Sequence, residues 1–541
     1  MDENLLGAVV GGSLSQGVEI KLDANASVED VRVGSFVTIA GEKQRFLGLV
    51  GDVALASSDR DLAAFAPAGG DQFVAQVLAG TAAYGVVTVQ PQLLLPLIAR
   101  EGQEVLPAKT IPPHFALAYR SSGADIAQVF GREDDRHFII GTPLDLDEKV
   151  CLDLHRLVER SSAVFGKSGT GKSFLTRLLL VGVAQKTSAS ILVFDMHSEY
   201  GWAARDSERG GRQVKGLKQL FPGRVAVFTL DEESARRRGI STDGVVRIGY
   251  NQVEPEDIAL LRETLNLTEN AAQAAYRLPS YIGDDGKRWG DDWLERFLAL
   301  TPGELDGVCT ALGEHQQTLG SLHRRLSQLR RFPFVGPYRD DRSLQAVLEN
   351  LGRGQHVVLE FGSYGRSLEA YILVANVLTR RIHDRYVRRV EQALGDPARE
   401  PRPLIIVIEE AHKFLNPQVA SQTIFGAIAR ELRKYNVTLL VIDQRPSAID
   451  QEVMSQIGTK VVCLLDNEKD VDAALSGVSG ARALREVLSR LESKQQALFF
   501  GHALPMPVAV RVRDYGTEQS YRELLQPAAS GHKATGDDLF G

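Results

Sequence analysis

The sequence has few cysteines, no long apolar run and no excess of positive charge. Its three cysteines, Cys151, Cys309 and Cys463, stand far apart, which excludes a disulfide framework and indicates no metal-binding spacing. No apolar stretch reaches the roughly 20 residues of a membrane-spanning helix, and the first residues lack the basic region of a signal peptide. We therefore expect a cytoplasmic protein that does not enter a membrane.

The net charge of -7 excludes a globally basic nucleic-acid binder. Any contact with DNA or RNA must then come from a local basic surface or from the lining of a pore. The composition, 44% hydrophobic and 24% charged, is that of an ordinary globular protein. A chain of 541 residues is too long for one hydrophobic core, so roughly two to four domains are expected.

One stretch, residues 166–173, matches the pattern G-x-x-x-x-G-K-S of a phosphate-binding loop. An apolar run precedes it and a helical pattern follows it, so backbone N–H groups and a helix N-terminus are expected to face one phosphate site. Lys172 is predicted to contact the β- and γ-phosphates of ATP, and Ser173 to bind Mg²⁺. The alternative is a plain Gly/Ser turn before a helix. The residues assigned to ATP are Gly166, Lys167, Ser168, Gly169, Thr170, Gly171, Lys172 and Ser173.

The second stretch is an apolar run, residues 404–408, which is followed by the adjacent carboxylates Glu409 and Glu410. We interpret the run as a buried strand beside the strand of the phosphate loop. Glu409 is assigned to the Mg²⁺ coordination sphere, and Glu410 to the general base that activates water. The alternative is a buried strand that simply ends in solvated acids.

Another buried strand is predicted over residues 191–194, and it ends at Asp195. Ligands of parallel sheets bind beyond the carboxyl ends of the strands, so Asp195 and Glu199 are expected near the phosphates. The alternative for Asp195 is a helix cap.

A strand over residues 438–442 leads to Gln444, which we predict to sense the γ-phosphate. Arg430 and Arg433, near the end of the preceding helix, are candidates for an arginine finger that reaches a neighbouring subunit's nucleotide. Either arginine could instead offset the helix dipole at the C-terminal end.

The first 100 residues differ from the rest, because short β-rich runs recur between turn residues and the first helical pattern starts only at 92–95. This pattern predicts a small closed β-barrel, which we interpret as a docking or assembly module rather than a catalytic domain. The predicted strands lie at 6–10, 18–22, 36–40, 46–55, 73–78 and 86–89.

Beyond the barrel, the pattern predicts an α/β ATPase core with a parallel sheet that is interrupted by a helical bundle. Apolar residues recur at spacings of three and four from about 252 to 331, as expected for helices. The predicted boundaries are the barrel at 1–100, a linker at 101–150, the core at 151–250 and 346–514, the bundle at 251–345, and a flexible tail at 515–541.

Five stretches together, in this order, resemble the HerA family of the HerA/FtsK class of DNA-translocating ATPases. The phosphate loop alone is not specific to this family, whereas the set of five is. The stretches are Gly166-Lys167-Ser168-Gly169-Thr170-Gly171-Lys172-Ser173, Asp195-Met196-His197-Ser198-Glu199-Tyr200, Ile408-Glu409-Glu410-Ala411-His412, Ala429-Arg430-Glu431-Leu432-Arg433-Lys434-Tyr435 and Gln444-Arg445-Pro446-Ser447.

The resemblance implies a RecA-like phosphate-loop core, and an N-terminal barrel like the one that this family shares with ATP synthase subunits. It also implies a hexameric ring with a central channel for double-stranded DNA and ATP sites at the subunit interfaces. The implied partner is the nuclease NurA in DNA end resection. In an antiphage branch of the family, the partner is a sirtuin-like NAD-consuming enzyme or a different nuclease.

Two alternatives remain beside an ATP-driven DNA translocase. A hexameric scaffold could use ATP to assemble and activate a partner enzyme, and it would respond to the partner rather than to DNA. A small-molecule kinase fits poorly, because no separate substrate site is evident and paired glutamates suit the activation of water. Many phosphate-loop ATPases carry Asp where this chain has Glu409, so the division of roles between Glu409 and Glu410 stays open.

Overall fold

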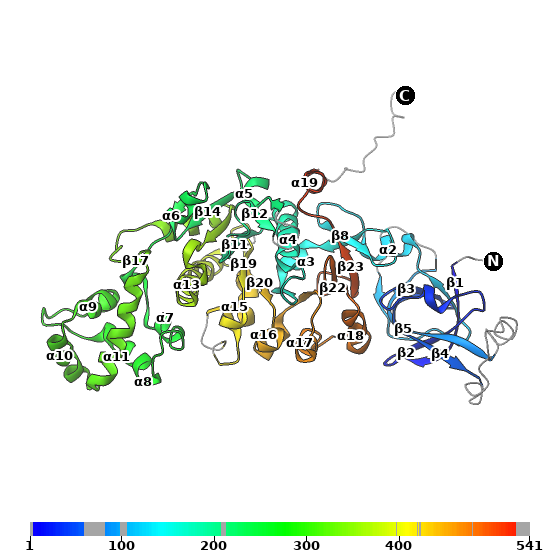
Figure 1. Cartoon of the computed structure of the whole chain (residues 1–541), viewed down its shortest axis with the longest axis horizontal. Helices are drawn as coiled ribbons and strands as arrows, with labels where there is room; N and C mark the ends of the chain where they lie inside the picture. Colours follow the sequence, from blue (N-terminus) through cyan, green and yellow to red (C-terminus); the bar gives the residue numbers. More distant parts are fainter. Residues whose placement is uncertain are drawn as a thin grey trace, which may run out of the picture.

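The computed structural model of the chain describes residues 4–58, 82–97, 105–206, 212–396, 398–418, 420, 424–478 and 480–525. The described part is elongated, with a small β-barrel at one end, a large sheet with helices around it in the middle, and a group of helices at the other end (Figure 1). Within these residues, no helix is both long and apolar enough to cross a membrane.

The N-terminal residues form the β-barrel that the sequence predicts. Its sheet follows the order β2-β1-β7-β3-β4-β5-β6, and β2 also pairs with β5, which closes the barrel. The barrel has a hydrophobic core of its own, which includes Val18, Ile20 and Val89. Its strands are β1 (Leu5–Ser13), β2 (Gly17–Leu22), β3 (Phe36–Ala40), β4 (Arg45–Ser57), β5 (Ala83–Leu95), β6 (Leu106–Pro107) and β7 (Leu117–Arg120).

Three details of the barrel differ from the expectation or lie beyond it. Residues 92–95 continue strand β5 instead of starting a helix, because buried and half-buried side chains alternate along the strand. The segment 101–150, expected to be a linker, contributes β7, which pairs with β1 and β3. The predicted strand at 73–78 lies outside the described residues.

The described residues also form a twelve-stranded sheet, in which the part from β15 to β21 is parallel, as expected for an α/β core. The part from β21 through β22, β23 and β8 to β9 is antiparallel, which the sequence analysis did not predict. In spatial order the strands are β15 (Gly244–Val245), β14 (Val225–Thr229), β18 (His356–Glu360), β11 (Ser190–Asp195), β19 (Leu404–Glu409), β20 (Val437–Asp443), β10 (Ser162–Phe165), β21 (Thr459–Val462), β22 (Gln496–Gly501), β23 (Val508–Val512), β8 (His137–Pro143) and β9 (Val150–Asp153).

The strand order corrects one expectation about the site. Strand β10, which leads into the phosphate loop, pairs with β20 and β21, whereas β19 pairs with β11 and β20. The prediction that β19 lies directly beside β10 is therefore wrong, because β20 separates them. Phe165 pairs with Asp443, and Glu409 pairs with Ile442. Since parallel strands end at the same edge of a sheet, the loop and both acidic strand ends share one edge.

Helices surround the central sheet, and one hydrophobic core joins their side chains to those of the strands. The longest of them, α13, starts just after β18 and continues for 26 residues. The helices of this region are α2 (Gly123–Phe130), α3 (Leu154–Glu159), α4 (Lys172–Lys186), α5 (Leu217–Leu220), α6 (Glu232–Arg237), α12 (Ser343–Gly352), α13 (Leu368–Ala393), α14 (His412–Leu415), α15 (Ile424–Glu431), α16 (Gln451–Gln456), α17 (Glu468–Ala474) and α18 (Ala481–Ser489).

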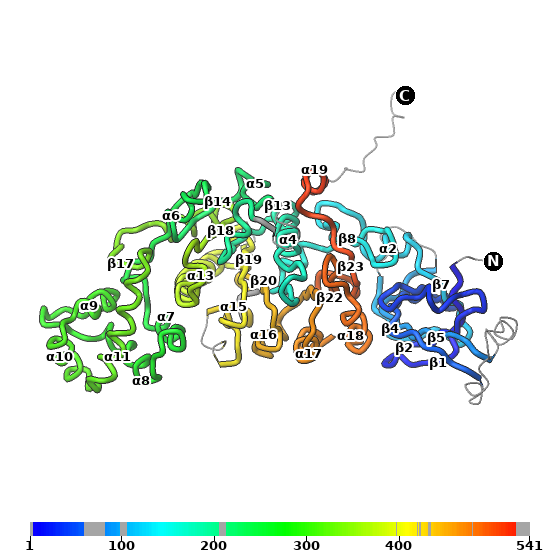
Figure 2. Tube along the Cα trace, in the orientation of Figure 1, coloured from blue at the N-terminus to red at the C-terminus, as the bar shows by residue number. Residues whose placement is uncertain are grey.

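Along the chain, a further group of helices lies between two short strands, β16 (Ile248–Gly249) and β17 (Val335–Gly336), which pair with each other. These helices gather at the end of the molecule opposite the barrel (Figure 2). Helix α11 contacts α8, α9 and α10, and it buries Leu319, Leu322 and Leu326. The α-helices are α7 (Pro255–Leu260), α8 (Glu269–Ala275), α9 (Trp293–Ala299), α10 (Pro302–Leu312) and α11 (Gln316–Leu326).

The start of the expected flexible tail is folded. Helix α19 (Glu518–Leu525) follows Tyr515, which is fully buried and whose ring lies 5.2 Å from the ring of Phe174 on α4. The amide of Gln185, near the other end of α4, donates a hydrogen bond of 2.6 Å to a main-chain carbonyl of α19. Tyr515 and helix α19 thus pack on the helix of the phosphate loop, while residues 526–541 lie outside the described residues.

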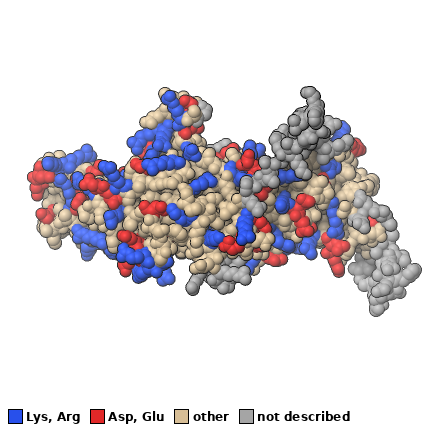
Figure 3. Space-filling model, turned by 90° about the horizontal axis from the view of Figure 1, so that it is seen from above, with Lys and Arg blue, Asp and Glu red and all other residues tan. Residues whose placement is uncertain are grey.

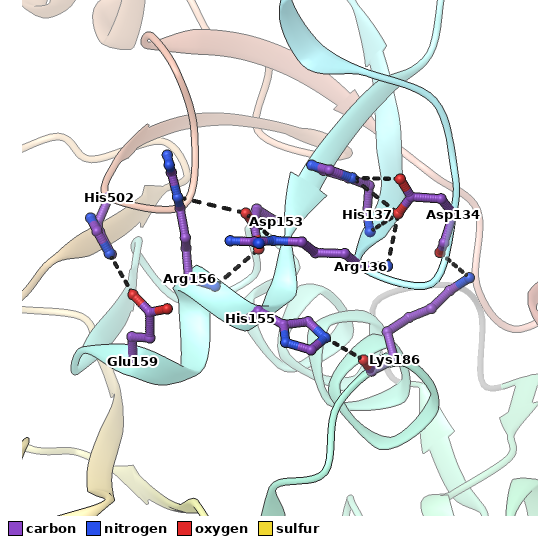
Figure 4. A network of polar contacts seen from close by, with 9 residues as sticks. All are labelled: Asp134, Arg136, His137, Asp153, His155, Arg156, Glu159, Lys186 and His502. Atoms are coloured by element: carbon purple, nitrogen blue, oxygen red, sulfur yellow. Dashed lines mark hydrogen bonds and ion pairs between the residues drawn. The ribbon is translucent and has the colours of Figure 1, made fainter. Parts of the chain in front are cut away.

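A polar network fixes the far end of helix α4 (Figure 4). The amine of Lys186 donates to the carbonyl of Asp134 at 2.7 Å, and the ring of His155 contacts the carbonyl of Lys186 at 3.0 Å. Beside them Arg136 donates to Asp153 at 2.7 Å, and Asp153 also caps α3. The turn before β8 and helix α3 therefore hold α4 at the end away from the loop.

Candidate nucleotide site

The phosphate-loop pattern folds as predicted, between the buried strand β10 and helix α4, which starts at Lys172. Gly169 and Gly171 have φ angles of 80° and 89°, a conformation that favours glycine. At Gly166, a Cβ would come within 2.8 Å of both Cys463 and Thr170, so this position requires glycine for space. The loop therefore brings backbone N–H groups and the positive end of a 15-residue helix to one place.

Two lysines of the loop are held in different ways. The amine of Lys172 donates to the carbonyl of Lys167 at 2.7 Å, and the hydroxyl of Thr170 donates to the same carbonyl at 2.8 Å. The amine of Lys167 instead pairs with Asp466, beyond β21, at 2.9 Å. The side chain of Lys172 therefore folds back across the loop that precedes its helix. A phosphate group bound in this loop would contact the amine.

Glu409, at the end of β19, is enclosed by two tyrosines. The hydroxyl of Tyr200 donates to its Oε1 at 2.9 Å, whereas its Oε2 is buried and has no hydrogen-bond partner. The hydroxyl of Tyr371 accepts from the main-chain N–H of Glu409 and donates to its carbonyl, at 3.2 and 3.0 Å. Burial, followed by the nearby charges of Asp195 and Glu199, raises the pKa of Glu409 to about 8.

Glu410 has a different environment from its neighbour. Its φ angle of 50° is left-handed, a conformation that costs a non-glycine residue about 1–2 kcal/mol and turns the chain away from the strand. Its side chain is 29% exposed, and its Oε1 accepts a hydrogen bond of 3.1 Å from the amide of Gln444. The structure thus gives one carboxylate that is enclosed and one that faces solvent, beside the residue predicted to sense the γ-phosphate.

Sequence reasoning did not assign a role to the pair formed by His412 and Asp443. Asp443 is buried at the end of β20, and it accepts hydrogen bonds from the backbone N–H groups of His412 and Arg445, both at 2.7 Å. Its Oδ2 also lies 3.0 Å from Nδ1 of His412. This hydrogen bond raises the pKa of His412 above its usual 6.5. The pair joins the turn that follows Glu410 to the turn that carries Gln444. The only signal of this pair in the sequence is that one apolar run, 438–442, is followed by Asp443 and an earlier run, 404–408, is followed by Glu-Glu-Ala-His.

The raised pKa of His412 predicts a pH-dependent contribution to stability. A base whose pKa is higher in the folded than in the unfolded state stabilises the fold fully below the unfolded pKa, and loses this effect as the pH rises through the folded pKa. The substitution His412→Asn should therefore destabilise the protein by roughly 1 kcal/mol more at about pH 6 than at about pH 9. Thermal unfolding at both pH values measures this difference. An equal shift in Tm at the two pH values would contradict it.

Asp195 and Glu199 lie near Glu409, and each makes contacts within the protein. Asp195 is fully buried and accepts hydrogen bonds from the backbone N–H groups of Glu199 and Tyr200, at 2.9 and 2.8 Å. This pattern is that of a carboxylate that closes a turn. It is not the helix cap considered as the alternative, because no helix starts at residues 196–201. Glu199 is half-exposed, and its carboxylate lies 3.6 Å from the buried guanidinium of Arg177 on α4.

One acidic residue of this edge was missed by the sequence analysis. Glu360 ends β18 and pairs in register with Asp195 on β11. It is fully buried and bonded to Arg238, and burial raises its pKa to about 7. Nothing in the run that contains it distinguishes Glu360 from an ordinary strand end, because its position depends on pairing with Asp195, 165 residues earlier (360 minus 195).

Of the two arginine-finger candidates, Arg430 makes its described contacts within its own chain. Arg430 donates to the carbonyl of Ala420 at 3.3 Å and pairs with Glu452 of α16 at 3.5 Å. The side chain of Arg433 lies outside the described residues. The structure thus brings together Lys172's loop, Glu409, Glu410 and Gln444 at one sheet edge, and ties Arg430 to its own chain.

Comparison with known proteins gives the family. Residues 138–382 match the family model described as "Helicase HerA, central domain". A relative from Methanocaldococcus jannaschii, named a probable DNA double-strand break repair helicase HerA, is 30% identical over 401 residues, which cover 67% of this chain and 73% of the relative. The DNA double-strand break repair helicase HerA of Pyrococcus furiosus is 23% identical over 465 residues, 81% of this chain and 79% of that protein. Among solved structures, VirB4 of Thermoanaerobacter pseudethanolicus aligns with a TM-score of 0.47 and 15% identity, over 72% of this chain and 99% of that one. The chain belongs to the HerA family and is an ATPase.

Proposed function

We propose that this ATPase drives movement along double-stranded DNA as a member of a hexameric ring. The observation that carries the proposal is the hydrogen bond of 3.1 Å between Glu410 and Gln444. This bond joins Glu410, the more exposed of the two adjacent acids, to Gln444 just after the end of β20. Strand β20 pairs with β10, which leads into the phosphate loop, so a change at the nucleotide can be passed on to the rest of the subunit. The relatives' names, DNA double-strand break repair helicases, support DNA as the track.

In the proposed reaction, backbone N–H groups of residues 166–173 and the amine of Lys172 bind the phosphates of ATP. Glu410 orients the attacking water and takes its proton, because it is the more exposed of the two adjacent carboxylates. Gln444, bonded to Glu410, senses whether the γ-phosphate is present. Arg433 or Arg430 would reach the nucleotide of a neighbouring subunit, which only the ring provides.

The residues present fit a Mg²⁺ ion that arrives with the nucleotide. No group of three or more His, Cys, Asp or Glu side chains is arranged to hold a metal in the described part of the chain. Ions that are bound mainly through phosphates need only one or two protein ligands. The buried Oε2 of Glu409 lacks a partner and would hold the ion's hydration shell, together with the hydroxyl of Ser173. Bound Mg²⁺ would neutralise charge on the phosphates.

The finer architecture belongs to the same proposal. We assign residues 151–250 and 346–514 to a RecA-like core, and residues 251–345 to a helical bundle inserted into it. The barrel would dock a partner, either a NurA-like nuclease in DNA end processing or a sirtuin-like or other effector in antiphage defence. Its separate hydrophobic core and its place at one end of the molecule support a docking role (Figure 1).

The surface charge bears on where DNA would run. In Figure 3, Lys and Arg side chains are interspersed with Asp and Glu over both ends of the visible face, and much of the middle is uncharged. A continuous basic face is absent from this view of the described residues. This mixture agrees with the net charge of -7 and favours a narrow, local DNA path such as the lining of a ring.

The proposal predicts an ATPase that responds to DNA. Linear double-stranded DNA should raise steady-state ATP hydrolysis several-fold, and the stimulation should fall steeply as salt is added, because phosphate contacts release counterions. Glu410→Gln serves as the blank. If the rate is flat with DNA but rises with a partner protein, ATP controls assembly of a scaffold and the translocase proposal fails.

A further inference from the structure

We infer that Tyr200 is a positioning residue, whose hydroxyl fixes the Glu409 carboxylate so that Oε2 faces the metal side of the site. The inference rests on the proposed role of Glu409 in holding Mg²⁺. Two buried hydroxyls contact Glu409, and only that of Tyr200 bonds the carboxylate, at 2.9 Å. The hydroxyl of Tyr371 bonds the main chain on both sides of the same residue.

The turn that carries Tyr200 is held by the carboxylate of Asp195. Asp195 accepts the backbone N–H groups of Glu199, Tyr200 and Gly201, the last at 3.4 Å. At Gly201 a Cβ would lie 2.9 Å from Oε1 of Glu360, so a side chain there would displace that buried carboxylate. The ring of Tyr200 is completely buried. A buried carboxylate that accepts three backbone N–H groups, together with a fully enclosed ring, places this one hydroxyl.

The main-chain contacts of Tyr371 explain why a second hydroxyl is needed. Strand β11 pairs with β19 only as far as Val407, so the N–H and carbonyl of Glu409 lack a strand partner on that side. Tyr371 supplies that partner and fixes the backbone. The carboxylate still has three rotatable bonds beyond the backbone, one more than an aspartate has, and these are restrained by the hydroxyl of Tyr200.

The remaining oxygen indicates the purpose of this restraint. Once Oε1 is occupied by Tyr200, Oε2 is buried without a partner. A buried carboxylate oxygen is costly to leave unpaired, so its neighbours must hold it for a group that arrives from outside. The chain Asp195, Tyr200, Glu409 thus gives the motif Asp195-Met196-His197-Ser198-Glu199-Tyr200 a role that requires no contact of its acids with the nucleotide.

The test compares two tyrosines that each contribute one buried hydroxyl to Glu409. Binding of a fluorescent ATP analogue is followed by anisotropy as MgCl₂ is added, in a Glu410→Gln background that prevents turnover. Tyr200→Phe should raise the Mg²⁺ concentration for half-maximal binding about tenfold or more, as loss of a group that orients a metal ligand usually does. Tyr371→Phe should lower Tm but shift the Mg²⁺ requirement less. Equal Mg²⁺ curves for Tyr200→Phe and the parent would overturn the inference.

Two further variants separate this inference from the proposed function. If Glu409→Gln leaves the Mg²⁺ requirement unchanged, the role of Glu409 itself fails; if it raises the requirement but Tyr200→Phe does not, only the inference fails. Glu409→Asp withdraws the carboxylate from the hydroxyl of Tyr200, so it should also raise the Mg²⁺ requirement. This variant tests the inference separately if the Tyr200→Phe protein does not fold. In the Glu409→Asp background, Tyr200→Phe should add little, because both changes remove one interaction. Full additivity would contradict the inference.

Discussion

Glu410→Gln is expected to bind ATP with nearly native affinity and to hydrolyse it about 100 to 10,000 times more slowly. The amide has the size of the carboxylate and can still bond Gln444, so the loop and the turn after β19 should keep their structure. It cannot accept a proton from water, and the base contribution is lost from kcat alone. Steady-state hydrolysis together with equilibrium nucleotide binding measures both quantities.

The control for this variant is Glu391→Gln, an exposed glutamate on α13. It removes the same charge from the chain without touching the carboxylate cluster, so its kcat should match that of the native protein. A Glu410→Gln protein that turns over normally would move the base elsewhere. Glu199 would then be the next candidate, because it is half-exposed and near Arg177, whereas Asp195 is buried and occupied by backbone N–H groups.

The parts of the site that local sequence could predict are those that local physics determines. The helix predicted after the phosphate loop forms, and it begins at Lys172, within the last residues of the loop. Glycines permit the turn before it, and the apolar run after Ser173 requires burial. Strand β19 ends at Glu409 for a similar reason, since five apolar residues are followed by two charges. The barrel strands could be predicted because side-chain alternation is itself a local signal.

Strand pairing across long separations could not be predicted in this way. The sequence does not reveal that β20 lies between β10 and β19, because the order of strands depends on how crossover helices pack and not on the strands themselves. The contacts of Tyr200, Tyr371 and Asp443 depend on that order. They join positions as far apart as Tyr200 and Glu409, 209 residues along the chain, and each looks like an ordinary core residue when taken alone.

Lys172→Ala is expected to weaken ATP binding about 10- to 150-fold, the effect of losing a charge-assisted hydrogen bond worth about 1.5–3 kcal/mol. The amine already lies across the loop, on the carbonyl of Lys167, so a bound phosphate needs only a short movement of one side chain to be met. Without it, the phosphate charge is balanced only by backbone N–H groups and the helix dipole. Anisotropy of a fluorescent ATP analogue measures the loss directly.

The matched control is Lys186→Ala, at the other end of the same helix. Its amine bonds the carbonyl of Asp134 in the network that anchors α4, so the variant loses a lysine and some stability while the loop keeps its charges (Figure 4). If both variants lost affinity equally, the effect of Lys172→Ala would be one of helix stability. If Lys172→Ala bound ATP as the native protein does, the nucleotide would have to lie away from residues 166–173. We expect Lys172→Ala to lose ATP binding and Glu410→Gln to lose turnover while it still binds ATP. Together these results would assign phosphate binding to the loop after β10 and water activation to the end of β19, at the same edge of the sheet.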